Sequence, residues 1–158
     1  MNNKWPLVEK IISGLLILFG ILAIYSALEY FFRVKSHSPN MTLVQLIINQ
    51  IYIWITGIIS ILSGIFMLAN KKAGWILSIP VILSLALIGG INNLFFPEIF
   101  YERTKFDILI TIGIITLIFI TVIILLAKYF RIKYAVNNKD YALMGFLILI
   151  MLASELII

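Results

Sequence analysis

Residues 11–28 read IISGLLILFGILAIYSAL, eighteen consecutive residues without a charged side chain. A run of this length is typical of a helix that crosses the hydrocarbon core of a bilayer, which needs about 20 apolar residues. The rest of the chain has the same character, because 63% of its 158 residues are hydrophobic and only 12% are charged. An ordinary soluble domain is about 45–50% apolar and about 25% charged. The sequence therefore predicts an integral membrane protein.

Four more apolar runs follow the first. Together they predict an all-α, polytopic membrane helix bundle that forms one domain over residues 1–158, with spans at residues 11–28, 43–69, 75–96, 107–127 and 142–158. The last span contains Glu155, and a charge at the bilayer centre costs about 2.5–3.5 kcal/mol. Its ten strongly apolar residues contribute roughly −3 to −6 kcal/mol, and Glu155 lies close to its end. Five spans are therefore preferred to the alternative of four.

The second and third predicted spans are joined by a tight turn. Residues 70–74 read NKKAG, which is long enough only for a helical hairpin. Gly74 is available as a left-handed helix cap. Trp75 follows directly and is suited to anchoring the next helix at the membrane interface.

The distribution of basic residues predicts the orientation, because Lys and Arg accumulate in cytoplasmic loops. With the N-terminus in the cytoplasm, eight basic residues fall on the inner side: Lys4, Lys10, Lys71, Lys72, Lys128, Arg131, Lys133 and Lys139. Four fall on the outer side: Arg33, Lys35, Arg103 and Lys105. We expect a plasma or inner membrane location with the C-terminus outside. The same bias accounts for the net charge of +5, so no nucleic-acid binding is expected.

The composition excludes several chemistries. The chain has no cysteine, which rules out disulfides, thiolate nucleophiles and iron–sulfur clusters. Its one histidine, His37, cannot supply bis-histidine haem ligation or a His-rich zinc site. The carboxylate oxygens of Glu98, Glu102 and Asp107 could hold a cation. Arg103 and Lys105 lie between these acids in the sequence and favour local ion pairs instead. We expect no enzyme, no cofactor and no metal site.

One face of the second predicted span is polar. Its members recur at steps of three or four residues, which places them along one side of a helix. They are Gln45, Asn49, Tyr52, Thr56, Ser60, Ser63 and Asn70, and Met67 fills the step between Ser63 and Asn70. Such a face either holds transmembrane helices together or lines a water-filled path. Small side chains favour the first interpretation, and Gly57, Ser60 and Gly64 are predicted to pack closely against another helix.

Candidate binding residues gather at the outer end of the predicted bundle. The residues of this candidate outer polar site are Glu29, Asn49, Asn92, Asn93 and Glu155. Glu29, the pair Asn92 and Asn93, and Glu155 each have an alternative role that involves no ligand. Glu29 has Arg33 four residues later, which is the spacing of a helical ion pair. The two asparagines are suited to capping the third span, and Glu155 to a solvated chain end.

These features predict a small membrane protein of non-enzymatic type, namely an accessory, assembly or partner-binding subunit. Its expected partners are the lipid bilayer and other membrane proteins, or a second copy of the chain. The alternative is a transporter or channel subunit with a polar site at the outer end. An intramembrane enzyme acting on lipid is least favoured, because no Ser–His or paired Asp arrangement lies within the spans.

Overall fold

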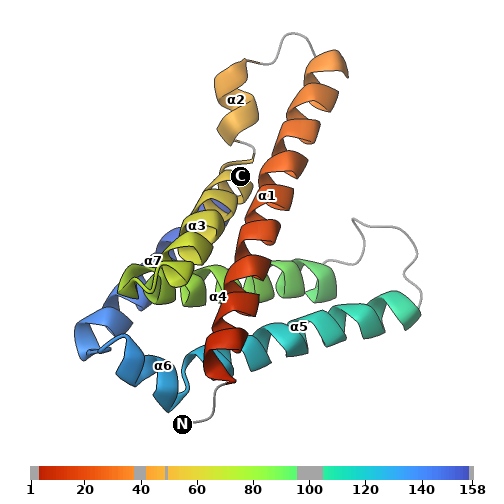
Figure 1. Ribbon diagram of the computed structural model, residues 1–158. Coiled ribbons are helices and arrows are strands. Elements are labelled where there is room, and N and C mark those ends of the chain that lie inside the picture. Colours follow the sequence, from red (N-terminus) through yellow and green to blue (C-terminus); the bar gives the residue numbers. More distant parts are fainter. Residues whose placement is uncertain (1–3, 38–41, 49, 96–104, 157–158) are drawn as a thin grey trace.

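The computed structural model describes residues 4–37, 42–48, 50–95 and 105–156, and within these ranges the protein is all-α (Figure 1). This confirms the predicted fold class at the level of secondary structure. The helices are α1 (Trp5–His37), α2 (Leu43–Ile48), α3 (Ile51–Leu68), α4 (Lys72–Phe95), α5 (Lys105–Leu125), α6 (Lys128–Lys133) and α7 (Asn138–Leu156).

Helix α1 extends beyond the apolar run 11–28 at both ends. It has 33 residues, which corresponds to a length of about 50 Å. Pro6 stands in the first turn, where the missing N–H costs no intrahelical hydrogen bond. At the other end, Glu29 and Arg33 form an ion pair across one turn, which supports a helix in polar sequence. Polar residues therefore flank the apolar run without ending the helix.

The predicted span 43–69 is divided in the structure. Helix α2 ends at Ile48 and α3 begins at Ile51. The carbonyl of Gln50 accepts the first hydrogen bond of α3, from the backbone N–H of Trp54 at 3.1 Å. Asn49 and Gln50 stand between the two helices in the sequence, and the apolar residues on either side of this amide pair led to the prediction of one continuous span.

Two helices have the length and hydropathy of a membrane span within the described residues. They are α1 and α3, with mean hydropathies of 2.5 and 2.1 over their most apolar windows. Apolar segments of α4 and α5, Lys72–Leu87 and Leu109–Leu125, have the same character but are shorter. Helices α1 and α3 are thus long and apolar enough to cross a membrane.

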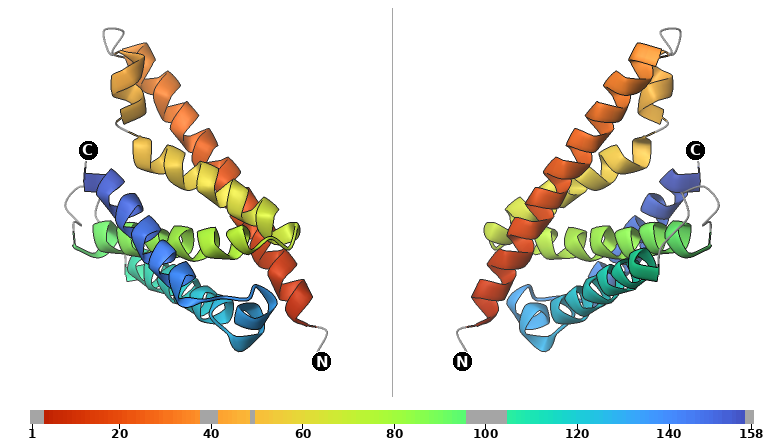
Figure 2. Two further views of the ribbon diagram at one scale, coloured as in Figure 1. Left: turned by 90° about the vertical axis from the view of Figure 1, so that its left-hand side faces the viewer. Right: turned by 90° about the vertical axis from the view of Figure 1, so that its right-hand side faces the viewer.

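The helices converge at one end of the molecule and diverge toward the other (Figure 2). The converging end contains the start of α1, the turn between α3 and α4, and residues 128–140, which comprise α6 and the start of α7 and are called the α6 segment; we call this end the basic end. Two ion pairs join these segments there, Lys133 with Glu9 and Lys72 with Asp140. Helix α3 packs along α1, and α4 packs against α3, α5 and α7.

The turn between α3 and α4 is closed by Asn70 rather than by Gly74. Asn70 has a φ of 54°, and the N–H of the next residue, Lys71, donates to the carbonyl of Phe66 at 2.8 Å. Asparagine tolerates the left-handed region, so the expectation that Gly74 caps the helix is wrong. Gly74 has a packing role instead, because a Cβ there would lie 2.3 Å from the backbone nitrogen of Met67.

Three of the largest fully buried side chains, those of Trp75, Phe130 and Met67, lie toward the basic end. Trp75 at the start of α4 is fully buried, and its indole N–H donates to the carbonyl of Leu125 at 2.7 Å. That carbonyl lies in the last turn of α5, where no intrahelical donor follows. Phe130 of α6 and Met67 of α3 complete this core. A buried indole needs a hydrogen-bond acceptor, and Trp75 therefore fixes α4 against the end of α5.

Candidate functional site

Gly57, Ser60 and Gly64 lie at the contact between α3 and α1. A Cβ at Gly64 would stand 2.6 Å from the carbonyl oxygen of Ser13, and the Ser60 hydroxyl donates to the carbonyl of Leu16 at 2.9 Å. Gly57 faces Gly20 of α1, where a Cβ would stand 2.6 Å from the Gly57 carbonyl. The backbones of α1 and α3 approach so closely that neither Gly20 nor Gly64 has room for a side chain.

The serine and threonine hydroxyls on the polar face of α3 donate to backbone carbonyls. Thr56 donates to the carbonyl of Tyr52 at 2.7 Å, and Ser63 donates to that of Gly74 at 2.9 Å. Both hydroxyl residues are buried, as is Ser60. A face whose donors are satisfied by helix backbone and covered by neighbouring helices favours packing over a water-filled path.

Of the candidate outer polar site, the structure describes only the side chain of Glu29, so the site stays a prediction. Glu29 lies on the exposed surface of α1, where its carboxylate pairs with Arg33 at 2.5 Å. Asn49 lies outside the described residues. Asn92 and Asn93 belong to α4 and Glu155 to α7, but only their backbone is described. Within the described part of the chain, no three acidic or histidine side chains come together as a metal site.

A buried polar cluster at the basic end was not predicted from the sequence. The Glu9 carboxylate, 4% exposed, pairs with the Lys133 ammonium and accepts a hydrogen bond from the Tyr134 hydroxyl. Lys133 also donates to the side-chain oxygen of Asn70 at 2.7 Å. We call these four residues the Glu9 cluster. It connects α1, the α3–α4 turn and α6, which are far apart in the sequence.

Electrostatics explain why the Glu9 cluster is held together. A buried carboxylate is costly unless it is paired and hydrogen-bonded, and Glu9 has both an ammonium and a phenol as partners. Burial, and secondly the hydrogen bond to Glu9, raise the pKa of Tyr134 well above its usual value. The phenol therefore stays protonated and acts as a donor. The sequence contained a signal for these ion pairs, because Glu9 and Asp140 are the two acidic residues on the predicted inner side, which also carries eight basic residues.

The second ion pair fixes the start of α7. Asp140 accepts from Lys72 at 2.6 Å and from the backbone N–H of Asn137 at 2.7 Å. The Asn137 side chain in turn accepts from the N–H of Lys139 at 3.0 Å, as an N-cap residue does. The hydrogen bond from Lys72 is the first cause that holds the pKa of Asp140 below its usual value, and the bond from Asn137 adds to it.

The two ion pairs leave an excess of positive charge at the basic end. Glu9 and Asp140 are each neutralised by a lysine. Six further basic residues form no ion pair within the described part of the chain: Lys4, Lys10, Lys71, Lys128, Arg131 and Lys139. All six are exposed. The surface of the basic end is therefore complementary to anions.

Comparison of the chain with protein-family models, with curated proteins and with solved structures finds no match. The functional argument therefore rests on the arrangement of this chain's own residues. The described residues provide close helix contacts, a basic end and largely apolar outer surfaces.

Proposed function

We propose that this protein is a small multi-pass membrane subunit without enzymatic activity, which binds another membrane protein or a second copy of itself. Five spans would be formed by α1, α3, α4, α5 and α7. The support is the hydropathy of α1 and α3 and the apolar side chains that cover the outer surfaces of α1, α5 and α7. In water such surfaces would promote aggregation, whereas in a bilayer they contact lipid.

The basic end supports an orientation with the N-terminus in the cytoplasm of a plasma or inner membrane. The start of α1, the α3–α4 turn and the α6 segment lie together (Figure 2), and these segments carry the basic residues counted for the inner side. Because basic residues accumulate in cytoplasmic loops, this end belongs in the cytoplasm. An uneven number of spans then takes the C-terminus outside.

The observation that carries the partner-binding role is the environment of the glycines. A Cβ at Gly20, Gly57, Gly64 or Gly74 would meet a neighbouring helix within 3.0 Å, whereas one at Gly14, Gly113 or Gly145 would meet nothing within 4 Å. Glycine inside a helix costs up to about 1 kcal/mol relative to alanine. This chain uses buried glycines for close helix contacts, and open glycines offer the same contact to a helix of another subunit.

Gly14 has the best-defined surroundings of the three open glycines. It lies on an exposed face of α1 whose members are spaced by three and four residues: Leu7, Ile11, Gly14, Leu18, Ile21 and Tyr25. Gly14 is the small member of this face, between the larger side chains of Ile11 and Leu18. This is the small-residue surface on which transmembrane helices approach closely.

The absence of native cysteine gives this proposal a clean test. If the partner is a second copy, a Gly14→Cys variant is expected to form a disulfide-linked dimer when it is oxidised in native membranes. If the partner is another membrane protein, a maleimide cross-linker is expected to join that protein to the Cys at position 14, and mass spectrometry identifies it. Thr116→Cys, at an exposed position of α5, is the matched control. Equal cross-linking at both positions, or none at Gly14, contradicts the proposal.

A transporter or channel subunit has less support. That alternative requires polar groups available to a solute, and the hydroxyls of Thr56, Ser60 and Ser63 on the polar face of α3 are occupied by backbone carbonyls. Loss of partner co-purification in mild detergent in Gly14→Leu, with unchanged thermal stability, would support the assembly role. Loss of solute flux with retained assembly would support transport.

A further inference from the structure

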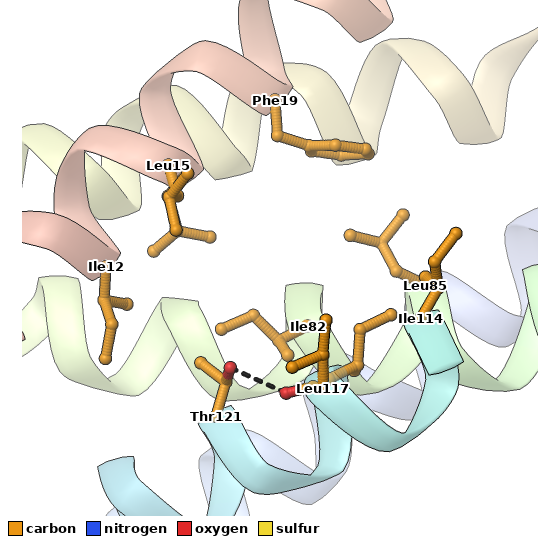
Figure 3. A pocket seen from close by; sticks show the side chains of 10 residues that line it. Ile12, Leu15, Phe19, Ile82, Leu85, Ile114, Leu117 and Thr121 are labelled. Carbon is orange, nitrogen blue, oxygen red and sulfur yellow. Dashed lines mark hydrogen bonds between the residues drawn. The ribbon is translucent and has the colours of Figure 1, made fainter. Parts of the chain in front are cut away.

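An apolar groove lies between α1 on one side and α4 and α5 on the other (Figure 3). Its volume is about 230 Å³. Ile12, Leu15 and Phe19 of α1 point into it from above in Figure 3, opposite Leu85 of α4 and Leu117 of α5. Thr121 is the polar member of its lining, and its hydroxyl already donates to a backbone carbonyl of α5 at 2.8 Å. The groove therefore suits a hydrocarbon occupant.

A second cavity continues the groove toward the diverging end of the molecule. It has a volume of about 350 Å³, shares Phe19 and Leu85 with the first, and extends along α1 to Ser26. The distance along α1 from Ile12 to Ser26 is about 21 Å. One leaflet of a bilayer provides about 15 Å of hydrocarbon. The two cavities therefore form an apolar path longer than one leaflet.

The lining of this path favours a flexible apolar chain as its occupant. Leu, Ile and Phe side chains of α1, α4 and α5 line the first cavity, and Phe19 and Leu85 also line the second. A hydrocarbon chain adapts to such an uneven apolar surface by rotation about its carbon–carbon bonds.

The end of the groove near Ile12 and Thr121 leads to the basic end of the molecule. Two turns before Ile12, Trp5 stacks on Tyr129 with the ring centroids 5.4 Å apart, as is typical of aromatic side chains at a membrane interface. Lys4 precedes this stack and Lys128 adjoins it in sequence, and neither forms an ion pair with a described residue. An anionic headgroup at this position would meet uncompensated positive charge.

We propose that the groove binds an acyl chain of an anionic phospholipid whose phosphate lies among the exposed cations of the basic end. This rests on the membrane location proposed above. The occupant follows from two observations: Thr121, the polar side chain that lines the first cavity, already donates to a backbone carbonyl, and the cations beside Trp5 and Tyr129 form no ion pair with a described residue. The lipid would fill the space between α1 and α5 and hold the two sides of the molecule together.

The test uses the purified full chain in nanodiscs of phosphatidylcholine containing a small fraction of a photoreactive phospholipid. The probe carries a diazirine on its acyl chain and either a phosphatidylglycerol or a phosphatidylcholine headgroup. Cross-linked positions are mapped by mass spectrometry. We expect the phosphatidylglycerol probe to label residues 12–26 and 114–121 preferentially, and unlabelled phosphatidylglycerol to compete with it.

Two variants separate the groove from the lipid-facing surface. Leu85→Trp fills the space where the two cavities meet and is expected to lower groove labelling by at least about fivefold, because the chain loses buried contact. Leu149→Trp, at a highly exposed position of α7, should leave it unchanged. The double variant Lys128→Gln/Arg131→Gln alters exposed residues and should abolish the preference for phosphatidylglycerol without lowering thermal stability.

Each outcome decides between the proposals. Labelling spread evenly over exposed positions, or unaffected by Leu85→Trp in a variant that keeps wild-type thermal stability, overturns the lipid site. Equal labelling by the two headgroups overturns its anionic character. Release of the chain from membranes by alkaline carbonate would contradict the membrane location itself, whereas retention without groove labelling would contradict only the lipid site.

Discussion

At the scale of single residues, Glu9 shows how much structure depends on one ion pair. Its carboxylate is buried and is held by Lys133 and Tyr134, which lie 124 and 125 residues further along the chain. Sequence spacing predicts contacts within a helix, and the pair Glu29–Arg33 is of that kind. Spacing contains no information on pairs that form only when distant segments converge, so it could not predict the partners of Glu9, although the presence of two acids on the basic inner side was a signal that they are paired.

Removal of the Glu9 charge is expected to destabilise the protein. Glu9→Gln leaves the ammonium of a partly buried lysine without its counter-ion, so we expect a loss of about 2–3 kcal/mol. Thermal unfolding in mild detergent measures it. Glu29→Gln breaks an exposed pair and should cost at most about 1 kcal/mol, which makes it the matched control. Equal unfolding temperatures for the two variants would disprove the structural role of the Glu9 cluster.

Tyr134 predicts a loss of stability at alkaline pH. Burial and the hydrogen bond to Glu9 raise the pKa of its phenol in the folded state, whereas the unfolded chain ionises near pH 10. The unfolded state therefore releases the proton first, so the contribution is complete below about pH 10 and is lost as the pH rises above it. Tyr134→Phe should flatten the decline of the unfolding temperature above pH 10.

A control variant isolates this effect from the titration of other groups. Tyr25→Phe changes an exposed phenol of α1 and should retain the alkaline decline of the wild-type protein. If Tyr134→Phe and Tyr25→Phe decline with the same slope, Tyr134 does not contribute.

At the scale of helices, the hydropathy pattern predicted the presence of long helices but not their ends. Backbone hydrogen bonds continue through polar flanking residues, as at the N-terminal turns of α1, so a helix outlasts its apolar run. Helix α6 has six residues and is too short for any periodicity to indicate it. Its stability comes from burial of Phe130 against Trp5 and the core, which is information that only the folded chain contains.

The contact between α1 and α3 yields a prediction about glycine. Gly64→Leu would place a branched side chain where a Cβ alone stands 2.6 Å from the Ser13 carbonyl and the Ile17 side chain. Overpacking of this kind costs about 1–3 kcal/mol or separates the helices. The unfolding temperature in detergent should fall accordingly. Gly145→Leu, at an open position of α7, is the control and should stay near wild type; the reverse order would mean that α3 does not pack on α1.

At the scale of the whole molecule, the ends of the helices differ in how they are held. At the basic end, two ion pairs, the Trp75 indole and the Trp5–Tyr129 stack join segments that are far apart in sequence. Toward the other end the helices diverge (Figure 2), and the two apolar cavities occupy the space between α1 and α4. A molecule fixed at one side and open at the other is suited to accepting an apolar partner from within the bilayer.

The proposed orientation predicts which residues a reagent outside the cell can reach. Single cysteines can be placed in this cysteine-free chain at Lys71 and Lys139 of the basic end and at Ser36 near the end of α1. A membrane-impermeant maleimide should label Ser36→Cys in intact cells, and it should label Lys71→Cys and Lys139→Cys only after the membrane is opened. A reporter that fluoresces only in the cytoplasm, fused after Ile158, should stay dark, because five spans take that end outside. A bright fusion with the same labelling pattern would mean that α7 does not cross the membrane. Labelling of Lys71→Cys in intact cells would reverse the orientation.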